Sequence, residues 1–404
     1  MPTMQISEKA KNIPEALSIY MNQLVYEQKR AGKDITTLSL GEAFFDIPMF
    51  DFEKTNFKQG YHYSESRGLP ELREKICEFY DRQYNTKVDY QKEILISAGS
   101  KPIIFMAMQA VLNEGDEVLI HEPGWLSYPE QAKLVGAIPK FIPYNCKVIE
   151  FEQYFTDKTR MVVINNPNNP AGWLYSKKDL LLLYKVCRKK GIYIMVDEAY
   201  SDFLLDEEFY SAARLSDKKE GIIVVNSLSK NLGMSGWRIG YVIASEEIIE
   251  NILKLNQHLI TCASTVLLRY VAYYFNEILD CTLPQVRAVV EKRKRVALYM
   301  DKIGLKYLQG SSTFYFFIDI GEFKEKSLDF ALYLLLKNDI AVVPGSAYGK
   351  STDHFIRISI GAESEFRIFT ALDTIKNLLS NPQFDRLFVL NYLKENNWKY
   401  FESK

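Results

Sequence analysis

Between residues 70 and 244, short apolar runs alternate with longer segments in which apolar residues recur every three or four positions. The apolar runs, bounded by polar or turn-forming residues, predict strands, and the longer segments predict amphipathic helices. The expected strands cover 93–98, 117–121, 139–143, 161–165, 192–196, 222–226 and 239–244. The expected helices cover 70–84, 101–112, 125–135 and 177–190. This alternation predicts an α/β fold whose mostly parallel sheet is covered by helices.

After residue 245 the pattern changes. A helical periodicity runs from 246 to 303 and contains Pro284, where we expect a break because proline lacks the N–H that a helix interior needs. Beyond it, a helix at 327–337 is expected among three strands, which indicates a smaller α+β unit. These strands cover 313–319, 340–343 and 355–360. The last stretch, 381–404, is polar and aromatic, and its pattern indicates no role.

Composition narrows the class of protein. The chain has 404 residues, enough for two or three domains, and its 50 basic and 51 acidic residues leave no excess charge for a nucleic-acid partner. Its five cysteines are scattered without the spacing of a disulfide or metal site, which favours a reducing cytoplasm and no bound metal. No apolar run reaches bilayer length and the first residues lack a secretion signal, so we expect no membrane partner.

The segment after the expected strand 222–226 carries the most informative chemistry. It contains Ser227, Ser229 and Lys230, an expected loop at 231–236, and Arg238. Because α/β sheets bind ligands at the carboxyl ends of their strands, Lys230 is placed where a ligand would bind. A desolvated lysine beside another cation has a lowered pKa and attacks aldehydes, while an arginine and two hydroxyls suit a phosphate. A lone lysine is equally typical of an exposed loop, but the spacing of the whole string favours the binding site.

Two upstream motifs end neighbouring strands. Asp197 closes the strand 192–196, and a buried carboxylate there requires a positive partner, such as a protonated pyridine nitrogen. Tyr200, three residues later, is placed to donate to a phenolic oxygen of the same ring. The strand before it runs into Asn-Pro-Asn-Asn-Pro-Ala-Gly at 166–172, a rigid loop that presents the amide of Asn169. Taken singly, Asp197 is also compatible with a helix N-cap, and the loop with a simple turn.

In this order, the motifs resemble those of the fold-type I aminotransferases that use pyridoxal 5′-phosphate, in the class I/II branch of the aspartate aminotransferase superfamily. That family has Asn-Pro-x-Asn-Pro-x-Gly, Asp-x-x-Tyr, Ser-x-Ser-Lys and Gly-x-Arg-x-Gly, and the resemblance covers about residues 35–375. It implies a large cofactor-binding domain at 46–285 and a discontinuous small domain formed by 1–45 and 286–404. It also implies pyridoxal 5′-phosphate as cofactor, and an amino acid and a 2-oxo acid as substrates.

The resemblance also assigns catalytic and binding roles. The catalytic residues would be Lys230, which holds the cofactor and transfers a proton, Asp197 on the ring nitrogen and Tyr200 on the phenolic oxygen. Phosphate contacts are expected from Gly99, Ser100, Lys101, Ser227, Ser229 and Arg238, and from Tyr63 of the neighbouring subunit in a homodimer with shared active sites. Trp125 would stack on the ring, although a core tryptophan is the plain alternative. Arg357 would bind the substrate carboxylate, together with Gly41 and Asn169; a structural salt bridge is its alternative.

The choice of amino acid depends on Lys101. Some relatives that accept aspartate carry a lysine here that contacts the side-chain carboxylate, which favours aspartate or glutamate. The alternative is that Lys101 only supports the phosphate or faces solvent. Departures from the commonest family pattern at Ala43, Pro102 and Ala171 are compatible with a specialised biosynthetic transaminase. A fold-type I lyase, decarboxylase or synthase would share every cofactor residue and stays open, whereas a DNA-binding regulator is disfavoured because little chain precedes the match.

Overall fold

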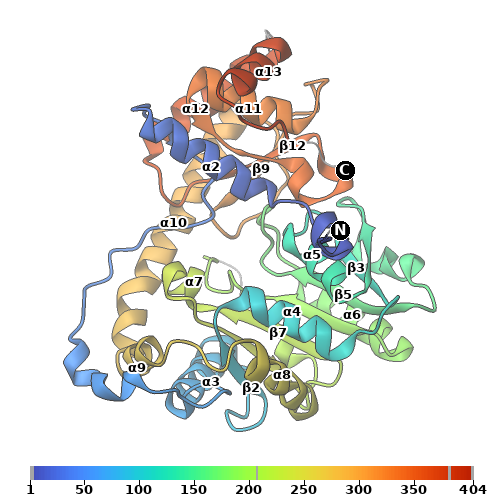
Figure 1. Ribbon diagram of the computed structural model, residues 1–404, viewed down its shortest axis with the longest axis vertical. Helices are drawn as coiled ribbons and strands as arrows, with labels where there is room; N and C mark the ends of the chain where they lie inside the picture. Colours follow the sequence, from blue (N-terminus) through green and yellow to red (C-terminus); the bar gives the residue numbers. More distant parts are fainter. Residues whose placement is uncertain (1–3, 206–207, 381–383, 402–404) are drawn as a thin grey trace.

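The computed structural model describes residues 4–205, 208–380 and 384–401, and the chain forms two lobes (Figure 1). Parts of the segments discussed above, at 1–3, 381–383 and 402–404, lie outside the described residues. The lower lobe in Figure 1 holds a seven-stranded sheet. The upper lobe contains β9 and β12 together with the last helices of the chain.

The large sheet has the strand order β2-β8-β7-β6-β5-β3-β4. Its strands are β2 (Ile94–Ser97), β3 (Glu117–His121), β4 (Ile138–Ile142), β5 (Thr159–Asn165), β6 (Tyr193–Asp197), β7 (Ile222–Ser227) and β8 (Gly240–Ala244). β8 pairs antiparallel with both of its neighbours, and all other pairings are parallel. The predicted α/β class is confirmed, and each of the seven expected strands forms with ends that differ by one or two residues at most.

Helices cover both faces of this sheet. Successive residues of a strand point to opposite faces, so Ile194 and Val196 join one hydrophobic cluster while Met195 joins another. The first cluster includes residues of α3 (Pro70–Tyr84), α6 (Lys177–Lys190) and α9 (Thr265–Tyr273). The second includes residues of α4 (Ser100–Val111), α5 (Ser127–Leu134) and α8 (Glu246–Leu259). Strands that are apolar on both faces are what a sheet between two helical layers requires.

The predicted helix break at Pro284 is wrong. α10 (Phe275–Ile303) continues through this proline, and the breaks lie earlier, between α8 and α9 and at Tyr274. A proline at 284 removes the N–H donor for the carbonyl of Asp280 alone, so a single helical hydrogen bond is lost. Packing of the buried face of α10 on both sides of Pro284 then keeps the helix continuous.

The upper lobe is an α+β unit, as predicted. β9 (Tyr315–Asp319), β11 (Val343–Pro344) and β12 (Phe355–Ser359) form an antiparallel sheet in the order β11-β12-β9, and β1 (Thr36–Thr37) pairs in parallel with β10 (Ile340–Ala341). Its helices are α2 (Leu17–Arg30), α11 (Ser327–Asn338), α12 (Glu365–Ser380) and α13 (Arg386–Glu395). The helices α2, α12 and α13 were not predicted from the sequence, nor was the short α1 (Glu8–Asn12).

The described part of the carboxyl-terminal stretch, whose pattern indicated no role, packs on the upper lobe. Tyr400 donates to Asp329 on α11 (2.8 Å), and Tyr20 on α2 donates to the carbonyl of Lys399 (2.7 Å). One hydrophobic cluster joins α2, α11, α12, α13 and β12. On this basis we propose the domain limits expected above, 46–285 and 1–45 with 286–404.

Two kinds of feature, a membrane-spanning helix and a metal-binding cluster, are missing from the described residues. None of their helices combines the length and the apolar character needed to cross a membrane. In the same part of the chain, no three His, Cys, Asp or Glu side chains are grouped so that they could hold a metal ion.

Candidate active site

The strand ends β5 and β6 bring two of the predicted motifs together at the carboxyl edge of the large sheet. The parallel register places Asn165 opposite Asp197. The side-chain amide of Asn165 donates to the Asp197 carbonyl (2.7 Å), and its oxygen accepts from the N–H of Asn169 (2.6 Å). The asparagine-proline loop is therefore fixed against the end of β6, with both predicted side chains at one edge.

Lys230 lies on α7 (Leu228–Asn231), a single helical turn directly after β7. The prediction of a loop over 231–236 is only partly right, because Asn231 closes this turn and η5 (Ser235–Trp237) forms a 3₁₀ turn. Asn231 is buried, and its amide donates to Ser201 (2.9 Å), which holds the end of α7 in place. Lys230 is thus carried by a short, anchored element, and not by a mobile loop.

The amine of Lys230 lies near charges of both signs. Its Nζ donates to the carbonyl of Gly41 (2.5 Å). Burial lowers the pKa of Lys230 to about 8; Glu42 opposes this change and the two arginines Arg357 and Arg238 add to it. Near neutral pH, a far larger fraction of this amine is uncharged than of an ordinary lysine, as a nucleophile requires.

Asp197 is buried and accepts two hydrogen bonds. The hydroxyl of Tyr128 donates to Oδ2 (2.6 Å) and the N–H of Ala199 donates to Oδ1 (3.1 Å). Burial raises the pKa of Asp197, and both hydrogen bonds and Lys230 oppose that rise. The role of Tyr128 was missed from the sequence, where its position three residues after Trp125 was the available signal. The carboxylate is therefore held in place by these two hydrogen bonds and suits a cationic partner.

A chain of side-chain contacts links the two lobes at this edge. Arg357 Nη1 donates to Asn169 Oδ1 (3.4 Å), and Asn169 Nδ2 donates to the Tyr200 hydroxyl (3.3 Å). The Tyr200 hydroxyl also contacts the Tyr315 hydroxyl (3.0 Å). Tyr315 was missed because an aromatic residue in an apolar strand is typical of a core. The structure thus brings Asn169, Tyr200 and Arg357 together, as predicted, and adds Tyr315.

Arg357 on β12 is 5% exposed. Its guanidinium lies close to two aromatic rings, with its central carbon 4.6 Å from the ring centroid of Tyr315 and 5.5 Å from that of Tyr348. Nη2 donates to the carbonyl of Ser39 (2.6 Å), while Nε has no hydrogen-bond partner among the described residues. Its two acceptors, on Asn169 and Ser39, are neutral oxygens, so this buried cation still requires a negative partner.

The residues predicted for phosphate binding surround the N-terminus of α4. Gly99 precedes this helix with φ of 92°, and a Cβ there would lie 2.5 Å from Nη2 of Arg238, so the arginine lies directly over the glycine backbone. Arg238 is exposed and donates to the Ser235 carbonyl (2.7 Å). Ser227 is buried at the end of β7, and Ser229 is partly buried. Helix N–H groups beside an arginine form a site typical of phosphate.

Lys101 and Trp125 lie together at the margin of this group. The Lys101 amine is 5.1 Å from the Trp125 ring centroid. Burial lowers the pKa of Lys101, and the charge of Arg238 lowers it further. Trp125 is partly buried, which leaves part of its indole accessible. Both positions are compatible with a cofactor or substrate contact, and neither chooses between the alternatives stated for Lys101.

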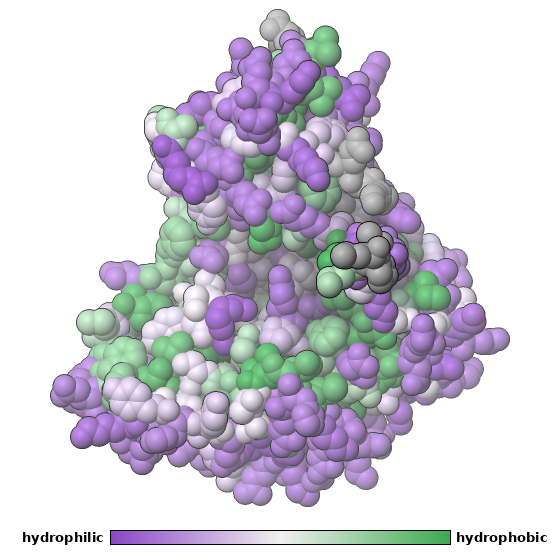
Figure 2. Space-filling model, in the orientation of Figure 1, coloured by the Kyte–Doolittle hydropathy of each residue, from purple (hydrophilic) through white to green (hydrophobic). Residues whose placement is uncertain are grey.

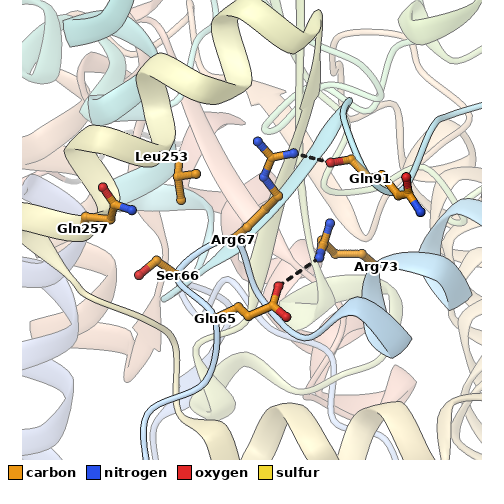
Figure 3. A pocket seen from close by; sticks show the side chains of 7 residues that line it. All are labelled: Glu65, Ser66, Arg67, Arg73, Gln91, Leu253 and Gln257. Atoms are coloured by element: carbon orange, nitrogen blue, oxygen red, sulfur yellow. Dashed lines mark hydrogen bonds and ion pairs between the residues drawn. The ribbon is translucent and has the colours of Figure 1, made fainter.

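Tyr63 is the predicted site residue that is turned to the outside, with 86% of its surface exposed. Residues that follow Tyr63 in the chain contribute to the lining of a cavity of about 440 Å³ (Figure 3). The cavity is lined by Glu65, Ser66, Arg67, Arg73, Gln91, Leu253 and Gln257. In Figure 3 Glu65 pairs with Arg73 and Arg67 reaches the Gln91 carbonyl. None of the predicted site residues lines this cavity. This cavity is therefore separate from the chemically organised edge.

Comparisons with known proteins agree on one family. The model of the family "Aminotransferase class I and II" matches residues 43–371. A relative from Aquifex aeolicus named "Probable aspartate/prephenate aminotransferase" is 34% identical, over 94% of this chain and 95% of the relative. An aspartate aminotransferase of Pyrococcus abyssi is 32% identical, over 86% of this chain and 92% of that protein. The solved structure of the Thermus thermophilus aspartate aminotransferase with maleate is similar with a TM-score of 0.85 and 26% identity, over 93% of this chain and 100% of that chain.

Proposed function

This chain belongs to the class I and II aminotransferases, and from that premise we propose that it transfers the amino group of aspartate or glutamate to a 2-oxo acid with pyridoxal 5′-phosphate held at Lys230. One observation carries the proposal. The Lys230 amine, whose pKa is lowered, interacts electrostatically with both Asp197 and Arg357, and Nε of Arg357 has no hydrogen-bond partner in the described part of the chain. An amine, an anion and a carboxylate-binding cation are what this chemistry needs at one place.

The residues at this edge fit the cofactor. Lys230 would bind its aldehyde carbon, Asp197 its ring nitrogen, and Asn169 and Tyr200 its phenolic oxygen, with Trp125 on the face of the ring. Its phosphate would meet Gly99, Ser100, Lys101, Ser227, Ser229 and Arg238. The absence of room for a Cβ at Gly99, beneath Arg238, supports a phosphate cradle there. Bound there, pyridoxal 5′-phosphate supplies an electron sink.

The protein's own groups then divide the work of proton transfer and orientation. Lys230 Nζ accepts the proton from Cα of the amino acid, and its lowered pKa suits a general base. Arg357 holds the α-carboxylate through two N–H groups, which favours loss of the proton over loss of the carboxylate by fixing the orientation of Cα. Tyr315 and Tyr348, whose rings lie against the guanidinium, limit its rotation. The hydrogen bond from Tyr128 favours the ionised form of Asp197.

The preference for a dicarboxylic substrate rests on relatives and on Lys101. Two of the relatives described above carry aspartate in their names. Lys101 is a cation at the margin of the site, beside Trp125, where it is placed for a second carboxylate. If Lys101 instead serves the phosphate, dicarboxylic and neutral amino acids would depend on it equally.

We also propose that the enzyme is a homodimer with shared active sites. Several large apolar side chains in the segment that leads to Tyr63 and on α9 are exposed, which is unusual unless a partner covers them. They are Phe44, Met49, Phe57, Tyr61 and Tyr273. Figure 2 has apolar side chains gathered over α9 and the adjoining segment, at the lower left of the view. A two-fold axis at this surface would carry Tyr63 to the partner's phosphate site.

A single-substrate spectral assay tests the proposal. The protein loaded with pyridoxal 5′-phosphate is mixed with one L-amino acid and no oxo acid. We expect the absorption band of the lysine-linked cofactor to convert to that of the aminated form with aspartate or glutamate, and not with Lys230→Ala. Conversion by no amino acid, with decarboxylated or eliminated products found by mass, would contradict the proposal and favour a fold-type I lyase.

A further inference from the structure

Glu122 is a buried carboxylate outside the groups described so far. It is 1% exposed and lies directly after β3, three residues before Trp125. Oε1 accepts the N–H of Lys350 (2.6 Å), and Oε2 accepts the N–H of Ser351 (3.1 Å) as well as the Ser351 hydroxyl. All three donors are neutral and come from one segment of the other lobe. A buried carboxylate is tolerated where several such donors replace its water.

The segment that Glu122 binds is the β11–β12 connection (345–354). It contains the 3₁₀ turns η6 (Gly345–Tyr348) and η7 (Lys350–Thr352). The Thr352 hydroxyl bonds to the carbonyls of Gly345 (2.9 Å) and Gly349 (3.0 Å), which makes the connection rigid within itself. It leads from β11, where Val343 lies opposite Arg357, into the strand β12 that carries Arg357. Holding this connection therefore holds the immediate surroundings of Arg357.

Two further contacts lock the same junction. Gly349 has φ of 153°, and a Cβ there would lie 2.4 Å from Cδ of Glu122, so the backbone is pressed against the carboxylate. The N–H of Gly124 donates to the carbonyl of Tyr348 (2.9 Å). The ring of Tyr348 lies against the Arg357 guanidinium. The tetrapeptide 122–125 thus binds the β11–β12 connection at one end and presents Trp125 at the other.

We propose that Glu122 is a positioning residue for the carboxylate-binding arginine: by fixing the β11–β12 connection to the segment that presents Trp125, it sets where Arg357 and Tyr348 lie relative to the cofactor side of the site. The inference rests on the proposed roles of Arg357 and Trp125. Glu122 touches neither substrate nor cofactor and acts through the connection. Its loss would misplace the substrate carboxylate while the Lys230 and Asp197 contacts are kept.

Glu122→Gln is the informative substitution, because it keeps the shape but replaces one acceptor oxygen by an NH₂ group facing an N–H donor. We expect KM for both the amino acid and the oxo acid to rise about tenfold, with a smaller change in kcat. The dissociation constant of maleate, a dicarboxylate that does not react, should rise by the same factor in calorimetry. The absorption band of the bound cofactor and its rate of reaction with hydroxylamine, which has no carboxylate, should stay as in the wild type.

Two further variants serve as a control and as a second test of the Glu122 contact. Glu150→Gln changes an exposed glutamate that accepts a backbone N–H from Lys147 (2.8 Å), and it should alter none of these quantities. Ser351→Ala removes a single hydroxyl donor and should raise KM and the maleate constant about threefold, so it tests the contact even if Glu122→Gln folds poorly. Unchanged KM and maleate affinity in both variants, or an equal loss of hydroxylamine reactivity, would overturn the inference. Failure of the wild type to react with any amino acid would instead count against the proposed function, since maleate binding needs no turnover.

Discussion

The two sides of the proposed site are built in different ways. The cofactor side, with Asp197 and Lys230, stands on the ends of adjacent parallel strands, and its supporting hydrogen bonds run between close elements of one lobe. The carboxylate side, around Arg357, combines β12 with Ser39 from the amino-terminal segment and Asn169 from the other lobe. The first is a property of one sheet, and the second depends on how two lobes meet. Substitutions on the two sides should therefore fail differently.

Lys230→Ala should have the largest effect and should strike the cofactor side alone. Without the amine, no group at the edge accepts the Cα proton, so kcat should fall by at least about 10⁴-fold in a steady-state assay. Lys133→Ala, which removes an exposed lysine paired with Glu130, serves as the control and should keep full activity. A loss of less than about tenfold for Lys230→Ala would mean that another base does the work.

Arg357→Lys should break the carboxylate side and spare the cofactor side. A lysine keeps the charge but loses the planar pair of donors, so KM for both substrates should rise about 30- to 100-fold, corresponding to about 2–3 kcal/mol. The cofactor band should persist. An unchanged KM would show that Arg357 has a structural role only, as in the alternative of a structural salt bridge.

Tyr128→Phe tests whether the cofactor side is tuned by its supporting hydrogen bond. Burial raises the pKa of Asp197 and Tyr128 opposes that rise, so removing the hydroxyl should raise the pKa further. Because the ionised carboxylate is the working form, activity is kept above this pKa and lost as pH falls through it. The acidic limb of the kcat profile should therefore move up by about one pH unit. A profile with the wild-type limb would exclude this role for Tyr128.

Lys101→Ser should have the smallest effect and should separate substrates. If Lys101 contacts the second carboxylate, KM for aspartate and glutamate should rise about fivefold while neutral amino acids are unaffected, as for a partly exposed ion pair of about 1 kcal/mol. The measurement is a comparison of kcat/KM across both classes of amino acid. Equal losses for both classes would assign Lys101 to the phosphate.

The difference between the two sides also explains what could be predicted from the sequence. Asp197, Tyr200 and Lys230 lie in short motifs at strand ends, and a strand can be recognised locally from its apolar run. Tyr315 and Glu122 act across the lobes, on partners far away in the chain. Nothing within a few residues of Glu122 indicates that it will bind Lys350 and Ser351. Such contacts arise only when the lobes have packed.

Errors in the predicted elements have the same origin. Pro284 has the local property of a helix breaker, but the packed face of α10 overrides it. The loop after Lys230 contains glycines, yet the buried contact of Asn231 with Ser201 fixes the first part as a helical turn. In both cases a tertiary contact decides against local preference.

The assignment of Lys230 as the cofactor-binding lysine is tested most directly by locating the cofactor on the chain. The loaded enzyme is reduced with borohydride, which makes the lysine linkage permanent, and its peptides are then mapped by mass spectrometry. We expect the phosphopyridoxyl group on Lys230, and we expect its loss from that peptide when aspartate is added before reduction. Labelling of another lysine, such as Lys101, or no stable label at all would contradict the assignment of Lys230.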